Sequence, residues 1–189
     1  MRKLLTALFF AALCGTASAA EITLTEREGY KPVIEVTGRI VNGDSDKFLA
    51  VIGKHRRGIV IMEGPGGDVD DALRIGVTIA ARGFATYVRP VKACHSGCAL
   101  MWLVGKDRYI GKSGQVGFHT VYNVDTKERR EPVNDWIRHT YLQYARLKPA
   151  VADYITKAGP DEIALLTPKD AKRVGIPVQF NAEPDWKAQ

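Results

Sequence analysis

Residues 58–71, GIVIMEGPGGDVDD, join three patterns that together decide the fold class. Residues 59–62 form a near-continuous run of branched and long apolar side chains, which is typical of a strand buried on both faces of a parallel sheet. A glycine-rich loop is expected at 64–67. The acidic residues within 68–71 then suit the start of a helix that runs to about Arg82, because they cap its first turn and oppose its macrodipole.

Strands and helices are expected to alternate on both sides of this stretch. Strands are expected at residues 33–40, 58–62, 85–91, 108–110 and 115–118, and helices at 46–53, 68–82, 97–104, 132–147, 150–158 and 167–173. The last helix has Thr167 as its N-cap, Pro168 at its first position and Gly175 as its stop. This alternation predicts an α/β fold with a mostly parallel sheet.

Residues 1–19 have the organisation of a cleaved signal peptide. A short basic start precedes the apolar residues 4–13, and residues 17–19 read Ala-Ser-Ala, the small-x-small pattern of a cleavage site. The apolar run is too short to cross a bilayer comfortably. We therefore expect cleavage after Ala19, export to the periplasm or the medium, and one domain over residues 20–189.

The charge of the chain gives little support to a nucleic-acid partner. The 27 Lys and Arg against 21 Asp and Glu give +6, and loss of Arg2 and Lys3 leaves 25 against 21, or +4. Basic residues are dispersed, and the compact cluster at 54–57 lacks interleaved aromatic residues. A solvated loop is the better interpretation of that cluster.

Ser96 lies between a predicted strand and a predicted helix, and His119 follows 23 residues later. A serine needs a base to become a nucleophile, and histidine is the usual base. Both residues lie near strand ends, and the carboxyl ends of parallel strands collect functional groups. The amide of Gly97, with that of Gly66 or Gly67, can bind an oxyanion. Taken singly, the serine is a helix cap, the histidine is structural and the glycines form a turn; their order favours an acyl-transfer site.

Cys94 and Cys98 are the cysteines that remain after export, and they flank Ser96. An oxidising compartment allows a disulfide to persist. Such a bridge contributes about 2 kcal/mol by the chain-entropy model, and it would stiffen the turn that carries the serine. A metal site of Cys94, His95 and Cys98 is the weaker alternative, because three clustered ligands do not match a structural zinc spacing. No metal or organic cofactor is expected.

Five short motifs, in order, resemble the Clp-type proteolytic-subunit superfamily of serine peptidases, in particular its small exported bacterial members with a Cys-x-Ser-x-Cys turn. They are GRI at 38–40, IVIMEGPGG at 59–67, CHSGC at 94–98, GKDRY at 105–109 and GFH at 117–119. The similarity runs from about Val36 to Val178. It implies the Clp/crotonase-like fold, a spiral of ββα units.

The resemblance also implies roles for single residues. Ser96 would be the nucleophile, His119 the base, and the amides of Gly66 and Gly97 the oxyanion hole. The long helix at 132–147 would pack between subunits, so a homo-oligomer is possible.

Two departures from the family pattern stand out. The third triad member should be an aspartate shortly before residues 166–171; Asp161 and Glu162 are one or two residues out of that spacing, and we take Asp161. An unfolding ATPase serves the cytosolic relatives, whereas an exported protein has no ATP supply, so no ATPase partner is expected.

The sequence therefore predicts an exported, ATP-independent serine peptidase that cleaves peptides or proteins through an acyl-enzyme. An alternative is a protein of the same fold with weak or no turnover that binds peptides. A crotonase-type enzyme acting on acyl thioesters fits less well. Export removes access to coenzyme A esters, and such an enzyme would leave the Ser–His pair unexplained.

Overall fold

The computed structural model describes residues 19–188, so the expected signal peptide lies outside the described residues except for Ala19. The strands are β1 (Glu21–Thr25), β2 (Val33–Ile40), β3 (Ile59–Gly67), β4 (Ala85–Val88), β5 (Ala93–His95), β6 (Arg108–Ile110), β7 (Gln115–Phe118), β8 (Ala164–Leu165) and β9 (Gln179–Phe180). The helices are α1 (Asp44–Ile52), α2 (Val69–Arg82), α3 (Gly97–Leu103), α4 (Glu131–Trp136), η1 (Ile137–Tyr141), α5 (Leu142–Tyr144), α6 (Ala150–Ile155) and α7 (Pro168–Val174).

Strand β3 is the centre of the sheet, because it pairs with three neighbours. Val60 pairs with Ile34 of β2 on one side and with Thr86 of β4 on the other. Further along, Gly64 pairs with Cys94 of β5. The sheet therefore branches into β4, β6 and β9 and into β5, β7 and β8. The pairings between the described strands β1 to β9 are parallel, except those of β1 with β2 and of β7 with β8.

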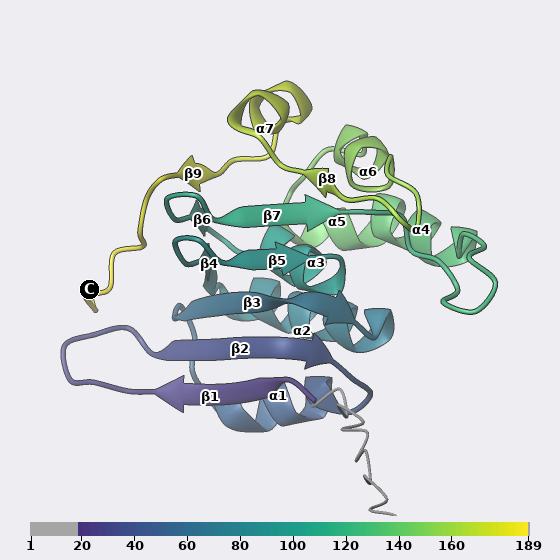
Figure 1. The fold of residues 1–189 in the computed structure, drawn as a ribbon. Helices are drawn as coiled ribbons and strands as arrows, with labels where there is room; N and C mark the ends of the chain where they lie inside the picture. Colours follow the sequence, from purple (N-terminus) through teal and green to yellow (C-terminus); the bar gives the residue numbers. More distant parts are fainter. Residues whose placement is uncertain (1–18, 189) are drawn as a thin grey trace, which may run out of the picture.

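Figure 1 shows β2, β3, β5 and β7 stacked one above the other, with α1, α2 and α3 behind them. This curled, mostly parallel sheet confirms the predicted α/β fold class.

The core lies between this sheet and the helices. Residues 59–62 of β3 are all buried, as the apolar run predicts, and every residue of α3 is buried as well. Tyr141 of η1 reaches α3, where its hydroxyl donates to the carbonyl oxygen of Leu100 at 2.9 Å. Burial raises the pKa of Tyr141. The helix after the hairpin at residues 121–130 is thus fixed to the helix that follows Ser96.

The capping predictions are confirmed. Asp68 Oδ1 accepts from the amide of Asp71 at 2.9 Å at the start of α2. Thr167 Oγ1 accepts from the amide of Asp170 at 3.1 Å at the start of α7, and Gly175 ends that helix with a φ of 79°.

Several predicted boundaries are wrong. Residues 64–67 are not a loop but continue β3, because β2 extends far enough for Arg39 and Ile40 to pair with Gly66 and Gly67. The strand expected at 85–91 ends at Val88, where a turn before β5 begins.

The helix expected at 132–147 runs without a break through α4, η1 and α5, with a π-helical turn in its middle, and ends earlier than expected, at Tyr144. Helix α6 ends before the expected residue 158, and α1 begins before the expected residue 46. Strands β1, β5, β8 and β9 were not expected. β5, β8 and β9 have two or three residues each, too few for a periodic signal, whereas the alternation of polar and apolar residues in Glu21–Thr25 was the available signal for β1. No helix among residues 19–188 is long and apolar enough to span a membrane.

Candidate active site

Ser96 occupies the turn between β5 and α3 in a strained conformation. Its φ of 56° and ψ of −125° lie where residues with a side chain are rarely found. The surrounding backbone holds it there, because its amide donates to the carbonyl oxygen of Gly117 at 2.9 Å and its carbonyl oxygen accepts from the amide of Leu100 at 3.0 Å. Strain of this kind persists only where neighbouring structure over-determines it, and it clusters at functional sites.

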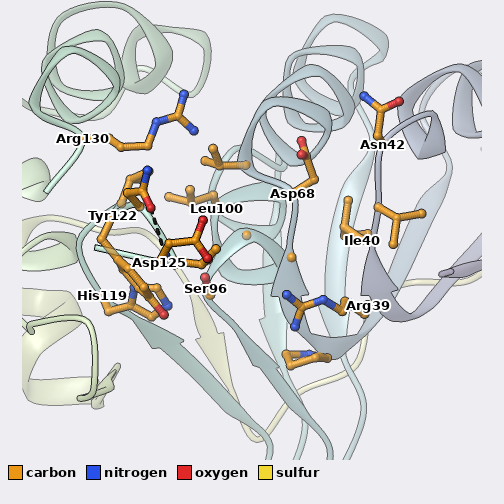
Figure 2. A pocket seen from close by; sticks show the side chains of 18 residues that line it. Arg39, Ile40, Asn42, Asp68, Ser96, Leu100, His119, Tyr122, Asp125 and Arg130 are labelled. Atoms are coloured by element: carbon orange, nitrogen blue, oxygen red, sulfur yellow. Dashed lines mark hydrogen bonds between the residues drawn. The ribbon is translucent and has the colours of Figure 1, made fainter. Parts of the chain in front are cut away.

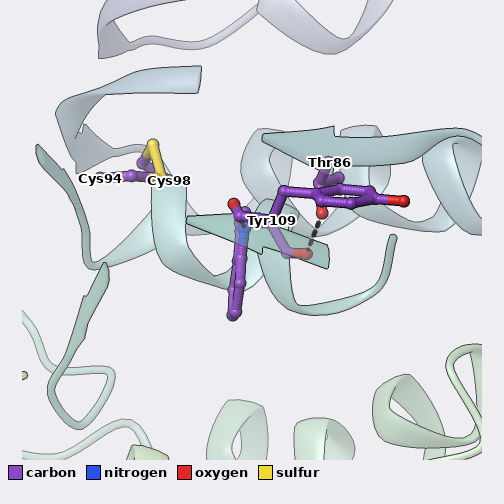
Figure 3. The surroundings of a disulfide bond; sticks show 5 residues. Thr86, Cys94, Cys98 and Tyr109 are labelled. Atoms are coloured by element: carbon purple, nitrogen blue, oxygen red, sulfur yellow. Dashed lines mark hydrogen bonds between the residues drawn. A yellow bond between two sulfur atoms is a disulfide. The ribbon is translucent and has the colours of Figure 1, made fainter. Parts of the chain in front are cut away.

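A disulfide joins Cys94 and Cys98 across this turn, with the two Cα atoms 5.2 Å apart. Both cysteines are buried, Cys94 in the middle of β5 and Cys98 in the first turn of α3 (Figure 3). Each sulfur is bonded to the other, so the structure favours the disulfide over the metal site that the sequence left as the weaker alternative. The bridge constrains the residues on both sides of Ser96.

Three glycines bring the end of β3 against the Ser96 turn. A Cβ atom on Gly66 would lie 2.6 Å from the amide nitrogen of Gly97 and 2.7 Å from Cβ of Ser96, so only glycine fits there. A Cβ atom on Gly97 would lie 3.6 Å from the amide nitrogen of Gly67. The end of β3 is therefore in close contact with Ser96 and with the amide of Gly97.

His119 follows β7 and lines the same cavity as Ser96. Its Nδ1 lies 2.7 Å from the carbonyl oxygen of Thr120. Because a carbonyl oxygen only accepts, Nδ1 carries the proton and Nε2 is left as an acceptor. Among residues 19–188, no hydrogen bond joins Ser96 to His119, and catalytic contacts are often long before substrate binds.

Asp161 and Glu162 are both exposed. The side chain of Asp161 is 81% exposed, and its Oδ1 lies 3.2 Å from Nζ of Lys127. The structure therefore brings Ser96, His119, Gly66 and Gly97 together but gives Asp161 a different partner from His119. In the structure His119 Nδ1 instead meets a backbone oxygen, a contact that no sequence pattern identifies.

His95, the neighbour of Ser96, does not line the cavity among the described residues. Its Nε2 is buried without a hydrogen-bond partner in the described structure, and a Cβ atom on Gly117 would lie 2.9 Å from its Cδ2. Burial lowers the pKa of His95, and the nearby charge of His119 lowers it further. His95 is thus a neutral packed side chain that lies outside the cavity lining described for Ser96.

A hairpin at residues 121–130 forms one wall of the cavity and was missed in the sequence. Tyr122 and Arg129 pair across it, and the amide of Asn123 donates to the carbonyl oxygen of Glu128 at 2.8 Å. Buried Asn134 holds its base, because Oδ1 accepts from the amide of Val121 at 3.1 Å and Nδ2 donates to its carbonyl oxygen at 3.2 Å. The polar run 125–130 was the available signal.

The cavity has a volume of about 560 Å³, within the range of small-molecule and peptide sites. Figure 2 shows Ser96 at its centre, with the hairpin and His119 on one side and β2 on the other. Its lining includes apolar, charged and polar side chains: Ile40, Val69, Leu100, Val121, Arg39, Asp68, Asp125, Arg130, Asn42 and Asn123. A bound substrate would therefore meet both apolar and charged groups.

Neither a protein-family model nor a curated protein matches this chain. Among solved structures, it is similar to a serine-to-alanine variant of the 1510-N membrane-bound stomatin-specific protease, with a TM-score of 0.55 and 15% identity over 77% of each chain. It is also similar to a lysine-to-alanine variant of that protease in complex with a substrate peptide, with a TM-score of 0.54 and 16% identity over 77% of this chain and 73% of that one. At this identity the likeness concerns the fold alone: the chain has a mixed α/β fold with a curled, mostly parallel sheet similar to that of these two structures.

Proposed function

We propose that this protein is an exported serine hydrolase that cleaves peptide or protein substrates through an acyl-enzyme at Ser96. The observation that carries the proposal is the strained Ser96 turn, which shares one cavity with His119 and with Gly67 at the end of β3. The similarity to two structures of a protease, one holding a substrate peptide, is in keeping with this chemistry.

In the proposed reaction, Ser96 Oγ attacks the carbonyl carbon of the substrate while His119 Nε2 takes its proton. The amide of Gly97 and that of Gly66 or Gly67 stabilise the negative charge that develops on the carbonyl oxygen. The protonated imidazole then passes its proton to the leaving amine, and the acyl-enzyme forms. Water, activated by the same histidine, releases the acid and restores the serine.

The orientation of His119 is assigned here to the carbonyl oxygen of Thr120, 2.7 Å from Nδ1, and not to Asp161. A neutral carbonyl fixes the tautomer and the plane of the ring as a carboxylate does. It stabilises the imidazolium less, because hydrogen bonds to ionised acceptors are stronger. The proposed machinery is therefore a Ser96–His119 dyad with a main-chain support, and its turnover should be modest.

Export is part of the proposal and is supported by the signal-peptide pattern and by the buried disulfide, which persists in oxidising compartments. The ATP-independent action follows from that location. Self-association stays a prediction of the sequence resemblance; the half-exposed Trp136 and Tyr144 on the helix after the hairpin are side chains that such contact would bury.

A second candidate is a peptide-binding protein of this fold without turnover. The contact of Asp161 with Lys127, in place of His119, favours it. Both candidates bind peptide in the same cavity, and they differ in whether Ser96 forms a covalent bond.

The test uses the processed protein, residues 20–189, with a mixture of quenched-fluorescence peptides and a neutral nitrophenyl ester. We expect a burst of nitrophenol equal to one equivalent of enzyme, slow peptide cleavage, and loss of both in Ser96→Ala and His119→Ala. The second candidate, a peptide-binding protein without turnover, would be supported if the wild type binds peptide but gives no burst of nitrophenol and cleaves the peptides no faster than Ser96→Ala.

A further inference from the structure

The charged side chains of the cavity divide into groups with and without a partner. Asp68 caps α2 through the amide of Asp71, and Arg130 faces Asp70 at 3.8 Å. The side chains of Arg39 and Asp125 have no hydrogen bond or ion pair within the described part of the chain. Figure 2 shows them approaching the cavity from opposite sides, Arg39 from β2 and Asp125 from the hairpin at residues 121–130.

Arg39 is held close to the candidate nucleophile by the sheet. It pairs with Gly66, the residue in contact with the Ser96 turn, and the register of β2 and β3 shifts between Thr37 and Arg39. Such irregularities re-aim a side chain and are frequent beside active sites. Neighbouring strands are about 4.8 Å apart and an extended peptide advances about 3.3 Å per residue. Two strand spacings, from β2 through β3 to the Ser96 turn, amount to about 9.6 Å, so Arg39 lies within about three residues of a scissile bond at Ser96.

The carboxylates nearest along this face of the sheet already have other partners. Glu35 is paired with Arg89 at 2.6 Å, and Glu63 is paired with Lys92 at 3.0 Å. The guanidinium of Arg39 points into the cavity instead, as Figure 2 shows. A cation left without an internal partner beside the reacting group is suited to a negatively charged group of a ligand.

We propose that Arg39 is a specificity-determining residue that binds a carboxylate of the substrate within about three residues of the scissile bond. This inference rests on the proposed function and names its substrate class, acidic peptides. A guanidinium binds a carboxylate through two parallel hydrogen bonds, which gives direction as well as attraction. Asp125, on the opposite side, repels the same group and so fixes which end of the cavity it occupies.

The carboxylate has two sources, an Asp or Glu side chain and the C-terminus of the peptide. Matched substrates separate them: one pair differs only by Glu or Gln in an amidated peptide, and a second pair differs only by a free or amidated C-terminus. We expect kcat/KM to be at least tenfold higher for the acid in one of these pairs. Arg39→Gln should bring that ratio close to one, and Arg39→Glu should favour a Lys-containing peptide.

Arg56→Gln is the matched control, because Arg56 is an exposed arginine that does not line the cavity. Arg56→Gln should keep the wild-type ratio of kcat/KM between the acidic peptide and its uncharged partner. An acid-to-amide ratio near one in the wild type, or a high ratio that Arg39→Gln leaves unchanged, overturns the inference.

A binding measurement separates this inference from the proposed function. Ser96→Ala should bind the acidic peptide at least fivefold more tightly than its amide partner, and the Ser96→Ala, Arg39→Gln double variant should bind both equally. Equal binding of the two peptides by Ser96→Ala contradicts the role of Arg39. If Ser96 fails to react with a neutral fluorophosphonate while this difference in binding is seen, the hydrolase proposal fails and the acidic-peptide site stands.

Discussion

Replacement of Gly66 by alanine tests whether the end of β3 and the Ser96 turn form one rigid unit. The added Cβ atom would lie 2.6 Å from the amide nitrogen of Gly97, whereas ordinary contact begins at 3.4 Å, so one side must retreat by about 0.8 Å. A displacement of this size moves both the serine and the amide expected to bind the oxyanion. Since loss of one oxyanion donor costs about a hundred- to thousandfold in rate, we expect kcat/KM to fall by at least that factor.

The effect on stability has two parts. The φ of 93° at Gly66 is costly for a residue with a side chain, by about 1–2 kcal/mol. Overpacking against Ser96 and Gly97 adds about 1–3 kcal/mol. The free energy of unfolding should therefore fall by about 2–5 kcal/mol, measured by urea denaturation.

Gly175→Ala is the matched control. Its φ is 79°, and nothing lies within 4 Å of the position of an added Cβ. It should lose only the conformational part, about 1–2 kcal/mol, and keep full activity. Full activity in a folded Gly66→Ala variant would refute the close approach on which the site depends.

Four further variants test separate parts of the account. Ser96→Gly relieves the strain at φ 56°, so it should raise the free energy of unfolding by about 0.5–1 kcal/mol while abolishing activity; a loss of stability would contradict the strain. Asp161→Asn should keep kcat within about twofold, whereas loss of a carboxylate that orients the base costs about 10⁴-fold, and a drop of that size would restore Asp161 to the site. The Cys94→Ala, Cys98→Ala double variant should lose about 2 kcal/mol and most of its activity; unchanged kcat would show that the turn holds without the bridge. His95→Leu should show a smaller drop in Tm than the wild type between pH 7.5 and pH 5. Burial lowers the pKa of His95 below 6.5, so the unfolded wild-type chain binds more protons than the folded protein as the pH falls, and the wild type is destabilised. Curves of Tm against pH that run parallel for the two proteins would contradict this.

The fold could be predicted from the sequence wherever a segment carries a periodic or composition signal of its own. The apolar run at 59–62 and the caps Asp68 and Thr167 are of this kind, because each depends on neighbours in the chain. The extension of β3 through Gly66 and Gly67 is different. It depends on pairing with β2, a contact across the sheet that overrides the turn preference of glycine and proline.

The site shows the same division. Ser96, His119 and the glycines could be named because their residue types carry the chemistry. In the structure Ser96, Gly67, Gly97 and His119 line one cavity, and Gly66 lies against Ser96. Asp161 was chosen by its distance along the chain, and it meets Lys127 of the hairpin at residues 121–130. The acceptor for His119 Nδ1 is a main-chain oxygen, and Arg39 reaches the cavity through strand register; neither feature leaves a mark in residue type or spacing.

The most direct measurement is the intact mass of the processed protein after reaction with a fluorophosphonate, followed by peptide mapping. If the hydroxyl and imidazole work together beside the main-chain donors, the wild type gains one phosphonyl group, carried by Ser96, and His119→Ala reacts at least a hundredfold more slowly. An unmodified serine in the folded wild type, or equal labelling in both proteins, would contradict the account.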